Sequence, residues 1–335
     1  MEWLIVGLIV LAIIVVAFVA FTVTLAAVIN KVVFGTRQDK IPDYKYFDCK
    51  DFGVSSEELP VSLYGVNLSA KIYSVKPAEE CERVVIFQHG FGAGTSSYMT
   101  EIAHFARQGF AVVAADSYGC NDSAGKNIKG FYAGAEAVIA AYAGVNCDER
   151  LKNKKIILVG HSWGAYSVLV ASARIKVDGV VAISAFNAPA QCLCDQLKNM
   201  SKITRRLAPL LHGAFWLLNL LKFGAKGNSK AAKRLKKSGV KALLIHGEND
   251  LIVPLNHSAA AKADGGSVQK LVLPDKKHNP YNTVAAEEKL AELSDGKEFK
   301  DAAEEAEYYK NFDWAAATEE DEAVMSKIDE FIENI

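Results

Sequence analysis

The chain begins with one long apolar run. From Trp3 to Ile29 it carries 27 residues without a charge, more than the ~20 that a helix needs to cross a bilayer core and more than the ~7–15 apolar residues of a signal peptide. This pattern predicts a retained, single-pass membrane anchor over residues 1–30. Basic residues follow the run and none precedes it, which by the positive-inside rule predicts a cytoplasmic location for the rest of the chain; they are Lys31, Arg37 and Lys40.

Short apolar runs recur after a polar linker at residues 31–45. Two strand-like runs flank a turn at Gly65 and predict an antiparallel hairpin. Helical stretches separate the later apolar runs, which cover residues 83–90, 110–119, 155–162, 179–186, 240–247 and 268–274. Continuous apolar strands that alternate with helices are typical of a mostly parallel sheet with helices on both faces. We therefore expect one α/β domain over residues 46–335.

The regular spacing breaks after residue 187, where about fifty residues precede the next strand. Within this insert, residues 206–223 are apolar on nearly all sides of a helix, which predicts a helical cap at about 190–238. Apolar residues in the last segment recur at helical spacing and predict a helix packed on the core; they are Val324, Ile328, Phe331, Ile332 and Ile335.

Composition narrows the class of protein. The chain is 50% hydrophobic and 23% charged, with a formal net charge of −1, which indicates a globular protein rather than a disordered one or a nucleic-acid binder. Basic residues are nevertheless concentrated in the insert. The six cysteines lack the spacing of a metal site, so we expect neither a metal nor an organic cofactor, and both free thiols and disulfides remain open.

The sequence GHSWG places Ser162 between Gly160 and Gly164, where a buried-type strand ends and a helix of small residues begins. This strand–turn–helix setting is typical of a nucleophile elbow, a strained turn that exposes the serine hydroxyl. Glycine is required on both sides because a Cβ atom there would collide with neighbouring backbone. We therefore predict that Ser162 is a nucleophile.

A serine nucleophile needs a general base, and the order along the chain selects one. In this topology an acid and then a histidine follow the serine, each on the loop after a later strand, and these loops converge at the carboxyl edge of the sheet. Asp250 follows the strand that ends at His246, and His278 follows the next strand. The predicted triad is therefore Ser162, Asp250 and His278.

Other residues compete for these roles. Glu248 is the alternative acid, with Asp250 then serving only to form a turn. His246 is expected to be a packed structural histidine, His161 is not free to act as a base, and His257 is expected to face solvent.

The loop QHGFGAG, residues 88–94, follows the first parallel strand, and its glycines allow the backbone to approach a ligand closely. The loop could supply backbone N–H groups to an oxyanion, bind an anion, or be an ordinary turn. It lacks the lysine of a P-loop and the full dinucleotide-binding spacing, so nucleotide binding is poorly supported.

These motifs together resemble the α/β-hydrolase superfamily, and within it the capped serine hydrolases similar to monoacylglycerol lipases and serine aminopeptidases. The resemblance covers about residues 45–335 and rests on HGFG, DSYGCNDS, GHSWG, GENDLIVP and the histidine of KKHNP. It implies that the backbone N–H groups of Phe91 and Trp163 hold the oxyanion, and it agrees with the triad. DSYGCNDS departs from many relatives, in which an arginine follows the aspartate, so the substrate is the least certain inference from the resemblance.

The expected function is therefore that of a membrane-anchored serine hydrolase acting on carboxylic esters through an acyl-enzyme. The apolar insert, its basic flanks and the anchor favour a lipid-derived ester, as in a lysophospholipase or monoacylglycerol lipase. A serine aminopeptidase or amidase is the alternative, and a non-catalytic, membrane-tethered binding protein is the remote one. The expected partners are a lipid or small-molecule acyl substrate and the membrane, without nucleic acid, and the sequence leaves the oligomeric state open.

Overall fold

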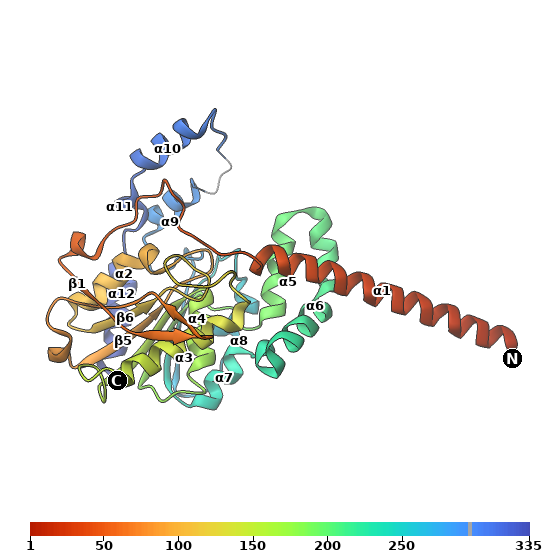
Figure 1. Cartoon of the computed structure of the whole chain (residues 1–335), viewed down its shortest axis with the longest axis horizontal. Helices are drawn as coiled ribbons and strands as arrows, with labels where there is room; N and C mark the ends of the chain where they lie inside the picture. Colours follow the sequence, from red (N-terminus) through yellow and green to blue (C-terminus); the bar gives the residue numbers. More distant parts are fainter. Residues whose placement is uncertain (294–296) are drawn as a thin grey trace.

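The computed structural model describes residues 1–293 and 297–335, and Figure 1 shows a central sheet between helices with one long helix extending from it. The eight-stranded sheet has the order β1-β4-β6-β5-β7-β8-β9-β10. Strands β5 to β10 run parallel, whereas β1 and β4 are antiparallel additions at one edge. The strands are β1 (Ser55–Glu58), β4 (Ala70–Ser74), β5 (Arg83–Gln88), β6 (Ala111–Ala115), β7 (Lys155–His161), β8 (Gly179–Ile183), β9 (Lys241–Gly247) and β10 (Val268–Leu273).

The predicted mostly parallel sheet is confirmed, and each of the six apolar runs contains one of its parallel strands. The predicted hairpin is also present, as β2 (Val61–Leu63) and β3 (Val66–Leu68), which form a separate two-stranded sheet. Strand β1, with the sequence SSEE, was not predicted, because all four of its side chains are exposed and it has no apolar face.

Helices cover both faces of the sheet and bury two hydrophobic clusters. Because successive side chains of a strand point to opposite faces, Val84 and Ile86 of β5 belong to one cluster, while Val85 and Phe87 belong to the other. The first cluster includes α3 (Phe131–Cys147), α4 (Trp163–Ala171) and α7 (Ala231–Ser238); the second includes α2 (Met99–Arg107) and α12 (Glu322–Glu333). The remaining short helices are α8 (Ala259–Lys262), α9 (Val284–Ala291), α10 (Ala302–Asn311) and α11 (Trp314–Ala317).

The insert between β8 and β9 is helical, as expected from its pattern. It contains α5 (Pro189–Met200) and α6 (Lys202–Phe223), and it ends with α7. A capping box between Ser201 and Thr204 starts α6, since each side chain accepts the backbone N–H of the other residue. Helix α6 buries one stripe, including Phe215, and leaves Leu210 and Leu221 exposed.

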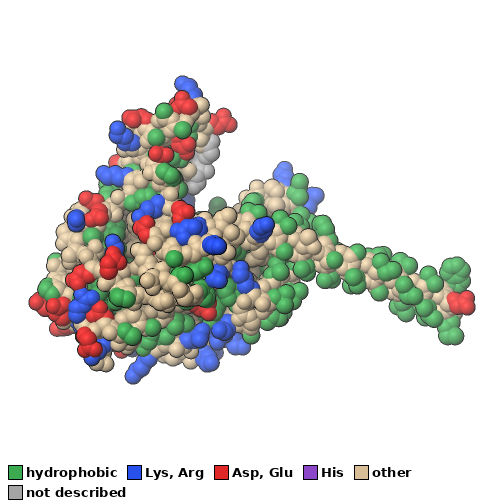
Figure 2. Space-filling model, viewed as in Figure 1, with side chains coloured by type: hydrophobic (Ala, Val, Ile, Leu, Met, Phe, Trp, Pro, Cys, Tyr) green, Lys and Arg blue, Asp and Glu red, His purple; other side chains and the backbone are tan. Residues whose placement is uncertain are grey.

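The N-terminal apolar run is one helix, α1 (Glu2–Phe34), which continues past the end of the predicted anchor. Residues 3–21 are exposed throughout, and apolar side chains cover this protruding part (Figure 2). From Thr22 onward one side of α1 packs on the domain, mainly along α6. By length and composition α1 and the segment Lys202–Ser238 are the candidate membrane spans among the described residues.

The predicted linker at residues 31–45 is tied to the domain. The Arg37 guanidinium donates hydrogen bonds of 2.5 to 2.9 Å to three backbone carbonyl oxygens of one loop, those of Asn121, Ser123 and Gly125. Its neighbour Gln38 forms a backbone bridge to Cys120 of the same loop. The segment that follows α1 is therefore part of the folded domain.

Candidate active site

Ser162 lies on the sharp turn between β7 and α4. Its φ of +55° falls in a region that residues other than glycine rarely adopt, and its N–H donates a 2.8 Å hydrogen bond to the carbonyl oxygen of Ile183 on the neighbouring strand. Such strain persists only where the surrounding structure enforces it, and it is typical of functional sites.

The two glycines of the motif leave room for this turn. A Cβ atom at Gly160 would lie 2.5 Å from the backbone carbon of Gly164, and a Cβ atom at Gly164 would lie 2.0 Å from the carbonyl oxygen of Gln88. Both distances are far below van der Waals contact, and the obstructing atoms are backbone. The steric role predicted for the two glycines is confirmed.

The structure brings the side chains of Ser162, His278 and Asp250 together. The Nε2 atom of His278 lies 2.9 Å from the Ser162 hydroxyl, and its Nδ1 atom lies 2.7 Å from a carboxylate oxygen of Asp250. A carboxylate only accepts hydrogen bonds, so Nδ1 carries the proton and Nε2 accepts the serine O–H. Glu248, the alternative acid, is exposed.

Asp250 is held as an ionised acceptor. Its second oxygen accepts the backbone N–H groups of Ile252 and Val253 at 2.9 and 2.8 Å. Burial by itself would raise the pKa of this carboxyl, but the hydrogen bond and charge of His278 outweigh it and lower the pKa below its usual value. The aspartate is therefore built to fix the orientation of the imidazole.

Two neighbouring histidines support the site without reaching Ser162. Nε2–H of His161 donates to the carbonyl oxygen of His278 at 2.9 Å, so Nδ1 accepts the Tyr98 hydroxyl at 2.8 Å. Burial lowers the pKa of His161 to about 3, which keeps the ring neutral. His246 is buried as expected and donates to the carbonyl oxygen of Val253 at 2.9 Å.

Phe91 and Trp163 both line the space in front of Ser162. Trp163 is the first residue of α4, and N–H groups in the first turn of a helix have no partner within it. The N–H of Phe91 takes part in no hydrogen bond among the residues that the structure describes. Both groups are therefore available to hold a negatively charged oxygen.

The loop that carries Phe91 is supported by two residues outside it. Gly92 N–H donates to the Gln38 side-chain oxygen at 2.7 Å, and Thr95 N–H donates to the buried carboxylate of Asp116 at 2.7 Å. Gln38 lies in the predicted linker, where no sequence pattern connects it to this loop. Asp116 belongs to DSYGCNDS, so its motif could have identified it.

His257 differs from its prediction. It does not simply face solvent: its Nδ1 atom lies 2.8 Å from the carboxylate of Asp195, a buried residue of α5. This contact joins the insert to the loop after β9. No sequence pattern indicates this contact, because the two residues are far apart along the chain.

The hydroxyl of Ser162 faces a cavity of about 440 Å³. The lining is mostly apolar, and it includes Cys192 and Leu193 from the insert and Val33 from α1. None of the described lining residues is an aspartate, glutamate, lysine or arginine. An apolar cavity with a few convergent polar groups is typical of a small-molecule site. All six cysteines are free, and no group of metal-ligating side chains occurs within residues 1–293 and 297–335.

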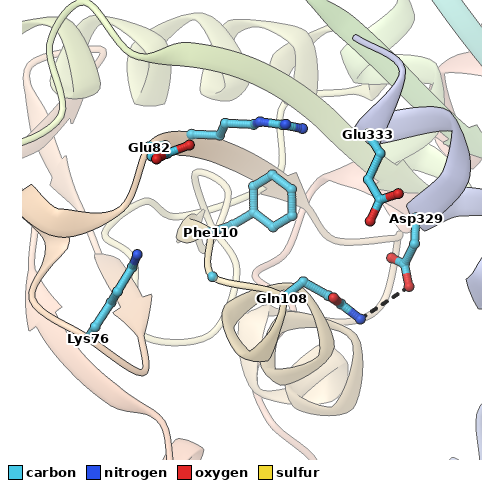
Figure 3. Close-up of a pocket in the computed structure, with 8 residues that line it drawn as sticks. Lys76, Glu82, Gln108, Phe110, Asp329 and Glu333 are labelled. Carbon is cyan, nitrogen blue, oxygen red and sulfur yellow. Dashed lines mark hydrogen bonds between the residues drawn. The ribbon is translucent and has the colours of Figure 1, made fainter.

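A second pocket, of about 220 Å³, lies where β5 and β6 begin, at the opposite end of these strands (Figure 3). Charged side chains dominate its lining, including Lys76, Glu82 and Glu333. The Gln108 amide donates to Asp329 across it at 3.3 Å. The described residues of its lining include no serine, cysteine or histidine, so it offers no counterpart of the Ser162–His278 pair.

Comparisons with known proteins agree with this architecture. Residues 83–210 match the protein family described as alpha/beta hydrolase fold. The chain is similar to a proline iminopeptidase of Saccharolobus solfataricus, 27% identical over 126 residues, and to the protein ABHD8 of Bos taurus, 26% identical over 223 residues. Among solved structures, the Pyrococcus furiosus esterase Pf2001 aligns with a TM-score of 0.58 at 16% identity, covering 77% of this chain and 95% of that chain.

The matches to the two curated relatives are partial. They cover 36% and 57% of this chain, and they span 37% of the iminopeptidase and 50% of ABHD8. The esterase structure matches almost over its full length, and at this identity it shows the shared fold.

Proposed function

We propose that the chain is a serine hydrolase that cleaves carboxylic esters, with Ser162 as its nucleophile; the match of residues 83–210 to the alpha/beta hydrolase fold family and the fold shared with the esterase Pf2001 support this. The observation that carries this proposal is the row of hydrogen bonds from Ser162 through His278 to Asp250, at the wall of an apolar cavity. The Ser162 hydroxyl needs a base, which His278 supplies, and His278 needs a carboxylate that orients its ring, which Asp250 supplies.

The reaction proceeds in two steps. His278 Nε2 takes the proton of the Ser162 hydroxyl as its oxygen attacks the ester carbonyl, and the resulting oxyanion accepts hydrogen bonds from the N–H groups of Phe91 and Trp163. His278 then donates the proton to the leaving alkoxide, which leaves an acyl-serine. Water, deprotonated by His278, attacks the acyl-serine; the bond to the Ser162 oxygen then breaks, His278 returns the proton to that oxygen, and the carboxylic acid is released. Asp250 stabilises the imidazolium in both steps.

The lining of the cavity favours esters over aminoacyl substrates. An aminopeptidase must bind a free, positively charged amino group, and a buried charge without a partner is costly. The described lining offers no carboxylate, only aromatic, aliphatic and uncharged polar groups besides the histidines. This composition supports an uncharged substrate with an apolar chain.

We also propose that α1 anchors the enzyme to a membrane and that the substrate derives from lipid. The exposed part of α1 is apolar, and α6, the helix on which the rest of α1 packs, carries three exposed basic side chains in its first part, namely Lys202, Arg205 and Arg206. Basic residues beside a membrane helix attract anionic lipids. By the positive-inside rule, the domain is cytoplasmic.

The test is hydrolysis of p-nitrophenyl esters from C2 to C12 by the full chain in detergent, compared with Ser162→Ala. Loss of the nucleophile is expected to lower turnover on the order of 10⁶-fold. Ser97→Ala, an exposed serine on the neighbouring loop, is the matched control and should retain activity. Equal turnover by Ser162→Ala and the wild type would refute the assignment of the nucleophile.

A peptidase remains the second candidate, favoured by the match to the iminopeptidase. An aminoacyl p-nitroanilide assayed beside the esters distinguishes the two. Faster cleavage of the anilide, dependent on Ser162, would make the protein a peptidase with the same triad.

A further inference from the structure

The last turn of α1 reaches the cavity in front of Ser162. Val33 is one of the lining residues, although it lies 129 positions before the serine and belongs to the helix proposed as the membrane anchor. Its neighbour Phe34 is buried and contacts the rings of Phe91 and Phe131 edge-on, with centroid distances of 5.8 and 5.0 Å. This contact fixes the end of the helix against the loop that holds the oxyanion donor Phe91.

The direction of the Val33 side chain follows from the phase of the helix. Consecutive residues of an α-helix are rotated by about 100°, and Val32, one position earlier, is 73% exposed. Val33 is half-buried between this exposed side and the buried side of Phe34. Among the described residues of α1, Val33 is the one that lines the cavity.

The wall around Val33 fits an apolar chain. Phe131, Phe186 and Leu193 line the same cavity. A hydrocarbon chain in such a site gains the free energy of leaving water, and this gain grows with each CH₂ group that is buried. No charged side chain among the described lining residues opposes it.

We infer that Val33 bounds the subsite for the apolar chain of the substrate, so that the helix preceding the catalytic domain takes part in selecting chain length. This inference rests on the proposed ester hydrolase function. It assigns to α1 a role in the reaction besides anchoring.

The experiment measures kcat/KM of the full-length protein in detergent for two ester series, p-nitrophenyl esters with acyl chains from C2 to C12 and acetates of C2 to C12 alcohols. Val33→Trp fills the subsite and should affect the series whose long chain, acyl or alcohol, occupies it. In that series kcat/KM is expected to fall at least tenfold for the C10 and C12 substrates and less than about twofold for the C2 substrate. Val32→Trp adds the same ring to the exposed side of the helix and is expected to keep the wild-type profile in both series.

A second variant keeps the test valid if Val33→Trp does not fold. Val33→Ala removes two methyl groups without adding bulk, and it is expected to weaken binding of the long substrates, with a rise in KM of about threefold or more and little change for the short ones. Thermal unfolding monitored by intrinsic fluorescence identifies any variant that fails to fold.

The outcomes separate the inference from the function on which it rests. A chain-length profile that Val33→Ala and a folded Val33→Trp leave unchanged in both series would overturn the role of Val33, while sensitivity to Ser162→Ala would still support the hydrolase. Activity that survives Ser162→Ala would instead remove the proposed function and the subsite with it.

Discussion

Two aspartate–histidine pairs lie in different parts of the fold. At the carboxyl end of the strands, Asp250 lies 2.7 Å from His278, and between helices α2 and α12 Asp329 lies 3.0 Å from His104. In the first pair one carboxylate oxygen contacts Nδ1 of the imidazole, and in the second pair both carboxylate oxygens contact Nε2, at 3.0 and 3.1 Å. The proposed chemistry nevertheless belongs to the first pair alone.

The partner of the second imidazole nitrogen makes the difference. In His278 this nitrogen faces the hydroxyl of Ser162, whereas in His104 it faces another carboxylate, Glu320, at 3.5 Å. Burial by itself would lower the pKa of His104, but hydrogen bonds to Asp329 and Glu320 outweigh it and raise the pKa to about 9. His104 is therefore an imidazolium at neutral pH and cannot accept a proton. The comparison indicates that the histidine of such a pair can act as a base when no second carboxylate contacts its other ring nitrogen.

The largest expected contrast comes from replacing each aspartate in turn. Asp250→Asn removes the acceptor that fixes the His278 tautomer, and it is expected to lower kcat by about 10⁴-fold. Asp329→Asn is the matched control and is expected to change kcat by less than about twofold. Steady-state ester hydrolysis measures both, and equal losses would show that the two pairs do not differ in function.

A smaller effect on catalysis is expected from a change in the contacts that support the loop of Phe91. The proposed mechanism needs this loop beside the Asp250–His278 pair and needs none beside the Asp329–His104 pair. Gln38→Ala removes the acceptor of the Gly92 N–H next to Phe91. We expect kcat to fall about tenfold with little change in KM, since the loop is needed most in the transition state. Gln38→Glu keeps an acceptor oxygen and should restore most of the activity, whereas an effect confined to KM would contradict this role.

The smallest expected effect is on the free energy of unfolding, and it comes from the Asp329–His104 pair. Because the folded-state pKa of His104 is raised, its ion pairs stabilise the protein fully below about pH 6.5, and this stabilisation is lost as the pH rises through about 9. Asp329→Asn is expected to lower the free energy of unfolding by about 1 kcal/mol at pH 6 and by less at pH 10. Urea unfolding at both values measures the difference, and a deficit that is independent of pH would show that the charge of His104 does not contribute.

The sequence was sufficient to predict the strands and helices that are marked by a local pattern of apolar residues. Strands β5 to β9 are buried on both faces, so each reads as a continuous apolar run, whereas the edge strand β10 is partly exposed. Strand β1 was missed because Ser55–Glu58 is a polar edge strand whose four side chains are exposed, and it pairs with β4 through its backbone and polar contacts without an apolar face. No pattern of side chains marks such a strand.

The triad residues could be selected because a motif and the order of strands constrain them. Gly160 and Gly164 mark the turn at Ser162, and the loops after β9 and β10 carry Asp250 and His278 to the same edge. Gln38 and Val33 could not be found in this way. Their contacts depend on how α1 and its linker pack on loops far away in the sequence, and neither belongs to a motif.

The division of α1 into a free part and a packed part has a consequence for the choice of lipid. The freely exposed stretch ends at Phe21, and Val33 lies twelve residues further, a rise of about 18 Å along the helix. In the proposed membrane setting, the exposed stretch has the length of the hydrocarbon core, so the reaction takes place well above it. A lipid must then leave the bilayer before it reacts, at a cost of about 0.8 kcal/mol for each CH₂ that leaves the hydrocarbon and is not buried again in the cavity. Because two-chain lipids incur this cost twice, the fixed height of the site discriminates against them and favours molecules with one chain.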